Sequence, residues 1–191
     1  MSIEKEFATV ALILGSDAET RGVDSFALSL IKAERQARKL VTYLVYQFPA
    51  FGPTDVTALR GALGASKHVY FEGFLTGFDA LYPRPVHALV GAEYAHLRPR
   101  LTEANAYRNK IFHGQLTGRE LSRQELVDLA KDINAWCTRL SAGAGGEIGY
   151  DGFGRDSFQK SAIPDLWKRY KLQLASVAAY QTFISTEMER Q

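Results

Sequence analysis

Residues 24–48 carry apolar side chains at three- and four-residue intervals, and this pattern constrains the fold more than any other feature. The apolar positions are Phe26, Leu30, Ala33, Ala37, Leu40, Val41, Leu44 and Phe48. The spacing is typical of one long amphipathic helix, because it places these side chains on a single face. Pro49 is expected to end this helix. A helix of this kind has to bury its apolar face against other elements.

Three other segments near the N-terminal half have helical or ambiguous patterns. A short helix is expected at 55–63. An aromatic-rich helix within 67–82 is expected to end at the prolines that follow it. Residues 3–14 suit a helix, but the same apolar run also suits a buried strand. The sequence leaves both structures open for this segment.

The next helical run begins near Pro85 and continues to His113, where Gly114 is a natural residue to follow the helix end. Pro99 lies inside this run. Proline removes a backbone donor and disfavours helical geometry in the residue before it, so we expect a break or kink at Arg98.

The last third of the chain combines a strong helix start with an abrupt change of composition. Ser122 is followed three residues later by Glu125, which is the spacing of a capping box, and an apolar stripe continues from there to residue 140. Six glycines in 141–158 then predict a loop or a short hairpin. A C-terminal helix is expected over 164–188, because a proline suits its first turn.

These patterns predict an all-α fold: an antiparallel bundle of four to five main helices, with a glycine-rich loop and an added C-terminal helix. A length of 191 residues favours a single domain. We assign residues 1–140 to the helical bundle and residues 141–191 to a segment that packs on the same domain.

The composition is that of a globular protein, with 46% hydrophobic and 23% charged residues. The single cysteine, Cys137, excludes an intramolecular disulfide and fits a reducing compartment. It lies in an apolar stripe, so a buried, inert thiol is expected. The apolar run at 7–15 lacks the flanks of a signal peptide and is too short to span a bilayer. We expect a cytoplasmic protein that does not associate with membranes.

Basic residues are concentrated in one window, although the net charge of only +2 does not by itself indicate a nucleic-acid partner. Residues 98–119 contain a single acid, Glu103. The basic residues of the window are Arg98, Arg100, Arg108, Lys110 and Arg119. A basic surface here would attract phosphates. The alternative is an ordinary solvated helix face.

The same window contains "AYRNKIFHGQ", residues 106–115. On a helix with about 100° per residue, Asn109 and His113 share one polar side. Arg108 lies beside the apolar stripe, so we expect its guanidinium to be partly sheltered and paired with an anion. That anion is either an acid of the chain or a phosphate.

An imidazole and a guanidinium are sufficient for cleavage of RNA without a metal, because the 2′-OH of the substrate is itself the nucleophile. His113 can donate and accept a proton near neutral pH. Arg108 can stabilise charge on the phosphoryl oxygens, and Asn109 can orient either group. The alternative is an internal polar network in which Arg108 pairs with a core acid and His113 bonds the last helix carbonyls.

"RNKIFH", residues 108–113, resembles the R-N-x-x-x-H form of the Arg–His motif of the HEPN superfamily, and the helical pattern over 24–140 resembles the fold of that family. The resemblance implies a metal-independent endoribonuclease, often a toxin or an antiviral defence effector. It also implies a homodimer in which two motifs meet in one cleft, and products with 2′,3′-cyclic phosphates. Arg108 and His113 would be catalytic, and Asn109 would support them.

The resemblance also bears on partners and on an alternative function. Some relatives carry a tyrosine two residues after the histidine, which an antitoxin modifies. This chain has Gln115 there, so that form of control is not expected, although an antitoxin protein remains a candidate partner. Other members of the superfamily are inactive and bind nucleotides, RNA or proteins. No cofactor is expected, and no spacing of His, Cys, Asp or Glu resembles a metal site.

Several basic residues are expected to hold RNA alongside the motif. They are Lys110, Arg100, Arg119, Arg155 and Lys160. The last two lie among aromatic residues of 150–160, and this combination can stack and hold a single strand. The alternative is a loop that folds back over the bundle with the aromatic side chains as its anchors.

Overall fold

The computed structural model describes residues 3–112, 121–154 and 156–189, without the side chains of residues 109–112. No β-strand occurs among these residues, so the predicted all-α class is confirmed and residues 3–14 are helical. The α-helices are α1 (Ile3–Leu14), α2 (Arg21–Tyr46), α3 (Val56–Ala65), α4 (Phe71–Leu81), α5 (Val86–Val90), α6 (Tyr94–Phe112), α7 (Arg123–Ile148) and α8 (Val177–Phe183).

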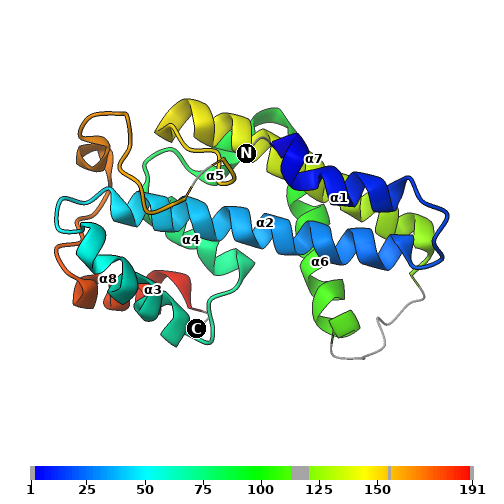
Figure 1. Ribbon diagram of the computed structural model, residues 1–191, viewed down its shortest axis with the longest axis horizontal. Helices are drawn as coiled ribbons and strands as arrows, with labels where there is room; N and C mark the ends of the chain where they lie inside the picture. Colours follow the sequence, from blue (N-terminus) through cyan, green and yellow to red (C-terminus); the bar gives the residue numbers. More distant parts are fainter. Residues whose placement is uncertain (1–2, 113–120, 155, 190–191) are drawn as a thin grey trace.

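The two longest helices, α2 and α7, form the centre of the molecule. Each has 26 residues and is therefore about 39 Å long. The helices α1, α4 and α7 all pack against α2, and α6 crosses this arrangement while packing against α7 (Figure 1). The short helix α8 packs against α3. The described residues thus form more helices than the four or five main ones that the sequence predicts.

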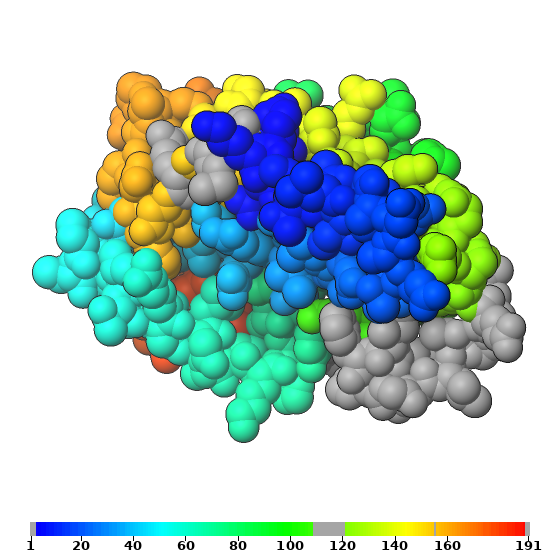
Figure 2. Space-filling model, turned by 45° about the vertical axis from the view of Figure 1, so that its right-hand side comes forward, coloured from blue at the N-terminus to red at the C-terminus, as the bar shows by residue number. Residues whose placement is uncertain are grey.

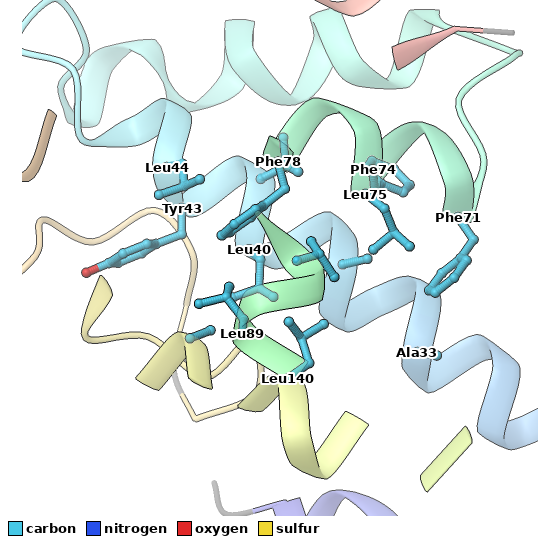
Figure 3. Close-up of a cluster of buried hydrophobic side chains, with 14 of the residues drawn as sticks. Ala33, Leu40, Tyr43, Leu44, Phe71, Phe74, Leu75, Phe78, Leu89 and Leu140 are labelled. Carbon is cyan, nitrogen blue, oxygen red and sulfur yellow. The ribbon is translucent and has the colours of Figure 1, made fainter. Parts of the chain in front are cut away.

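The apolar face predicted for α2 lies in the core. All eight predicted apolar residues are at most 4% exposed, including Phe48, which lies just after the end of α2 at Tyr46. Figure 3 shows Leu40 and Leu44 of this face beside Phe78 of α4, with Leu89 of α5 and Leu140 of α7 close by. The burial of this one face against three helices supplies much of the hydrophobic stabilisation of the fold.

The helical run that begins near Pro85 is interrupted at Gly91 and not at Pro99, so the predicted position of the break is wrong. Gly91 ends α5 with a φ of 77°, and a short 3-10 turn over Gly91–Glu93 leads into α6. A positive φ ends a right-handed helix and favours glycine. Pro99 lies inside α6, which continues past it.

The helix α7 begins at the predicted capping box. The Oγ of Ser122 accepts a hydrogen bond from the backbone N–H of Glu125 at 3.2 Å. The Glu125 carboxylate in turn accepts one from the backbone N–H of Ser122 at 2.8 Å. Two N–H groups that lack helical partners are therefore satisfied, as this motif requires.

The prediction of a loop or hairpin over 141–158 is wrong for its first half, because α7 continues to Ile148. A Cβ atom on Gly143 would lie 2.2 Å from the backbone oxygen of Leu89. Glycine at this position therefore allows the backbones of α5 and α7 to meet. Gly149 then ends α7 with a φ of 72°.

The second half of the glycine-rich segment folds back over the bundle on aromatic anchors, as one of the two alternatives predicts. The Tyr150 ring stacks on the ring of Tyr43, with centroids 4.5 Å apart. Phe153 is 4% exposed and packs edge-on against Phe7 of α1. The side chain of Gln36 donates one hydrogen bond to the backbone oxygen of Asp151 in this segment and another to that of Cys137 in α7. These aromatic rings therefore belong to the core.

A single C-terminal helix over 164–188 is not present. Residues 166–169 form a 3-10 turn, and regular helix appears only in α8, which ends in a π-helical turn over Ile184–Met188. The backbone N–H of Lys171 donates to the oxygen of Leu81 at the end of α4. Its ammonium donates to the oxygen of Asp79. Bonds to α4 therefore replace the local bonds of a helix.

Candidate functional site

The Arg–His motif lies at the C-terminal end of α6, and the structure describes the side chain of only one of its three polar residues. Arg108 is described in full. Asn109 is on α6, but its side chain is outside the described set, and His113 lies outside the described residues. The site therefore has to be built around the guanidinium of Arg108.

The guanidinium of Arg108 pairs with an acid of α2. Its Nη1 lies 3.2 Å from Oε2 of Glu34, and the two side chains are 27% and 31% exposed. This confirms the predicted partial shelter of Arg108. An ion pair with this degree of exposure contributes about 0–1 kcal/mol, so a phosphate can compete with the carboxylate for the guanidinium.

The residues before Arg108 on α6 place one side of this helix in the core. Ala104 is fully buried, and Tyr107 packs against the core with its hydroxyl donating to Glu103. The Asn105 side chain donates to the backbone oxygen of Leu101 at 3.0 Å. Ala104 and Tyr107 therefore belong to the core face of α6, and the amide of Asn105 is bonded to its own helix.

The other two described arginines of the basic window are also paired with carboxylates. Arg98 binds Glu72 of α4 through two nitrogens. Arg100 binds Glu103 on α6 and Asp132 on α7, the latter at 2.8 Å, and the Asp132 bond raises the pKa of Arg100. The three described arginines of the window are therefore matched in space by acids, and three of these acids lie on other helices: Glu34, Glu72 and Asp132. The side chain of Lys110 and the whole of Arg119 are outside the described set.

Lys160, predicted to bind RNA, is bonded to the end of α2. Its ammonium donates to the backbone oxygens of Tyr46 and Phe48, the latter at 3.0 Å, and lies 4.7 Å from the centre of the Tyr46 ring. Burial lowers the pKa of this ammonium. Lys160 thus satisfies carbonyls that a helix end leaves without partners. Arg155 lies outside the described residues.

A surface groove of about 620 Å³ begins next to Arg108, because Glu34, the partner of Arg108, is one of its lining residues. One wall is α2. The other consists of α3 with the residues after it and of residues 156–158. In Figure 2 the light-blue surface of α2 lies between the orange residues near 156 and the cyan-to-green residues of α3 and beyond.

The groove has a net positive lining among the described residues. Its acids are Glu34 and Asp156, and its cations are Arg35, Arg38, Lys39 and Arg60. Four cations against two carboxylates favour an anion. Burial lowers the pKa of the Lys39 ammonium, and the neighbouring Arg35 lowers it further.

The sequence contains only part of the signal for this groove. Arg35, Arg38 and Lys39 recur at helical spacing on the polar face of α2, where they are also what a solvated face would carry. Arg60 has no local signal at all, because it reaches the groove through the packing of α3. These cations are absent from the sequence-based set of RNA-binding residues.

Cys137 is fully buried, as predicted. Burial raises the pKa of its thiol, which makes it a poor nucleophile. Within the described ranges, no three His, Cys, Asp or Glu side chains are grouped closely enough to hold a metal ion. Among the helices described, none is both long enough and apolar enough to cross a membrane.

Comparison with known proteins adds no relative. No protein-family model, no curated protein and no solved structure matches this chain.

Proposed function

We propose that this chain is a metal-independent endoribonuclease of the HEPN type, acting as a toxin or an antiviral defence effector. The proposal rests on the Arg–Asn…His sequence at the end of α6. One observation carries it: Arg108 is partly exposed at the edge of a cationic groove, where a phosphate can reach it.

The chemistry requires only groups of the chain and of the substrate. The 2′-oxygen attacks the adjacent phosphorus while the bond from phosphorus to the 5′-oxygen breaks. This leaves a 2′,3′-cyclic phosphate and a 5′-hydroxyl. His113 removes the 2′-OH proton, and an imidazolium supplies a proton to the departing 5′-oxygen. Arg108 stabilises the additional negative charge on the phosphoryl oxygens.

A homodimer would supply both imidazoles in their two protonation states, with two motifs in one cleft. An antitoxin protein that covers the same cleft would restrain the enzyme.

A second candidate function is an inactive HEPN-like module that binds RNA without cutting it. The ion pair between Arg108 and Glu34 favours this alternative, because a carboxylate already occupies part of the guanidinium. The cations of the groove would still hold phosphates in such a module.

Incubation of the purified protein with single-stranded RNA in EDTA separates the two functions. The endoribonuclease proposal predicts cleavage that does not require added divalent metal. Salt-sensitive binding without any product would instead support the inactive module. Cleavage that occurs only after a metal is restored would contradict the proposal.

Replacement of Glu34 by glutamine is expected to strengthen RNA binding. The change keeps the shape of the side chain and removes the charge that competes with phosphate for Arg108. An exposed ion pair of about 0–1 kcal/mol corresponds to a gain of up to about fivefold in affinity. Fluorescence anisotropy with labelled RNA measures it, and Glu93→Gln, which changes an exposed acid paired with Arg139, is the control. Weaker binding by Glu34→Gln would show that the carboxylate positions Arg108 productively.

A further inference from the structure

We propose that the groove between α2 and α3 holds the backbone of a single RNA strand that leaves the cleavage site at Arg108 and passes toward Arg60. That the ligand is RNA rests on the proposed function. The groove, by contrast, is formed by residues outside the Arg–His motif, and these residues supply its cations and define the direction in which it runs.

The groove follows one face of α2 away from the Arg108 ion pair. Glu34, Arg38 and Thr42 all line it at four-residue intervals, which on a helix places them one above the other along about 12 Å. A strand bound at Arg108 therefore meets Arg38 next, and an extended path continues beyond it.

The cations along this path differ in how strongly they are already paired with carboxylates of the chain. Arg38 is exposed and makes no ion pair with a described residue. Arg60 lies 3.7 Å from Asp156, and both side chains are more than half exposed, so this contact is weak. Arg35, in contrast, bonds the buried carboxylate of Glu6 at 2.9 Å. Arg38 and Arg60 are therefore the cations most available to phosphates.

The far end of the groove also offers a surface for a base. The Arg60 guanidinium lies 4.9 Å from the centre of the Phe158 ring, and 61% of the Arg60 side chain is exposed. Bases of unpaired RNA stack on aromatic rings and on guanidinium planes. Two walls with such a platform suit one flexible strand, whereas duplex RNA is recognised by shape across a broad surface.

The proposal is tested with a fluorescent 2′-O-methyl RNA single strand, which lacks the attacking hydroxyl and so separates binding from cleavage. The double variant Arg38→Ala/Arg60→Ala is expected to lose about tenfold or more in affinity. Its plot of log K against log salt concentration should be shallower by about 1.4, since each lost contact to a single strand removes about 0.7. Both side chains are exposed, and circular dichroism verifies that the variant is folded.

The matched control is Lys131→Ala/Arg139→Ala, which removes the same charge from an exposed part of α7. This control should bind with an affinity within about twofold of that of the wild type. Arg38→Lys keeps the positive charge, so it should bind the strand more tightly than Arg38→Ala and nearly as tightly as the wild type. Equal loss in the control, or no loss in the groove variant, would overturn the proposal. Tighter binding of a mononucleotide or of duplex RNA than of the single strand would also overturn it.

The outcome is independent of catalysis. Groove-dependent binding by a wild-type protein that cuts no RNA in EDTA would refute the endoribonuclease and leave the groove assignment intact. Cleavage of RNA by the wild-type protein, together with unchanged affinity in the Arg38→Ala/Arg60→Ala variant, would support the endoribonuclease and refute the groove assignment.

Discussion

Replacement of His113 by alanine is expected to reduce RNA cleavage by about 10²–10⁴-fold, the usual contribution of a general acid–base group. Alanine leaves the Arg108 cation in place but removes the imidazole that is proposed to take the proton from the 2′-hydroxyl and, in the partner copy, to supply one to the departing 5′-oxygen. The affinity for the 2′-O-methyl strand should change little, because that strand is held through its phosphates. A gel assay of cleavage with equal protein concentrations measures the effect.

The matched control is His96→Ala. His96 is an exposed histidine near the start of the same helix, α6, and its replacement should leave cleavage unchanged. Cleavage by His113→Ala at the wild-type rate would contradict the assigned role of the imidazole.

Arg108→Lys is expected to cleave RNA more slowly as well, because an ammonium keeps the charge but lacks the planar fork that binds two phosphoryl oxygens.

Replacement of Gly143 by alanine is expected to destabilise the fold by about 2 kcal/mol or more. The new Cβ would lie 2.2 Å from the backbone oxygen of Leu89. Backbone of α5 cannot rotate away as a side chain does, so α5 and α7 have to separate, and overpacking of this kind costs about 1–3 kcal/mol or more. Urea unfolding followed by circular dichroism gives the change in the free energy of unfolding.

Gly145→Ala provides the matched control in the same helix. No heavy atom lies within 4 Å of a Cβ at that position. Alanine has a higher helix propensity than glycine, so this variant should be more stable than wild type by up to about 1 kcal/mol. Similar effects of the two substitutions would mean that Gly143 is not required for close approach of α5.

The parts of the fold that the sequence predicts well depend on local rules. The apolar period of α2 predicts which face of the helix is buried. The capping box formed by Ser122 and Glu125 predicts where a helix starts, and this prediction does not depend on what the helix packs against. Both signals depend only on residues of one continuous segment. The structure confirms both of them.

The parts that the sequence predicts wrongly depend on contacts between distant segments. A cluster of glycines usually indicates a loop, but Gly143 is required because Leu89 lies against it. The helical pattern before α8 is overridden because Lys171 bonds the end of α4. Neither partner can be identified from the local sequence. Tertiary contacts of this kind routinely outweigh helix propensity.

The candidate site shows the same division. The helical period predicts that Arg108 is partly sheltered, and its exposure agrees. Which acid pairs with it depends on how α2 and α6 cross, so Glu34 could not be named in advance. The same applies to Arg60, which enters the groove from α3. Local sequence identifies chemically capable residues, and packing decides which of them share a site.

The ends of the RNA fragments formed in EDTA test the proposed endoribonuclease most directly. Attack by the 2′-hydroxyl predicts fragments with 2′,3′-cyclic phosphates and 5′-hydroxyls, formed by the wild-type protein and absent with His113→Ala. Fragments with 3′-hydroxyls and 5′-phosphates would contradict this mechanism. Cyclic phosphates formed equally by both proteins would contradict the role of His113.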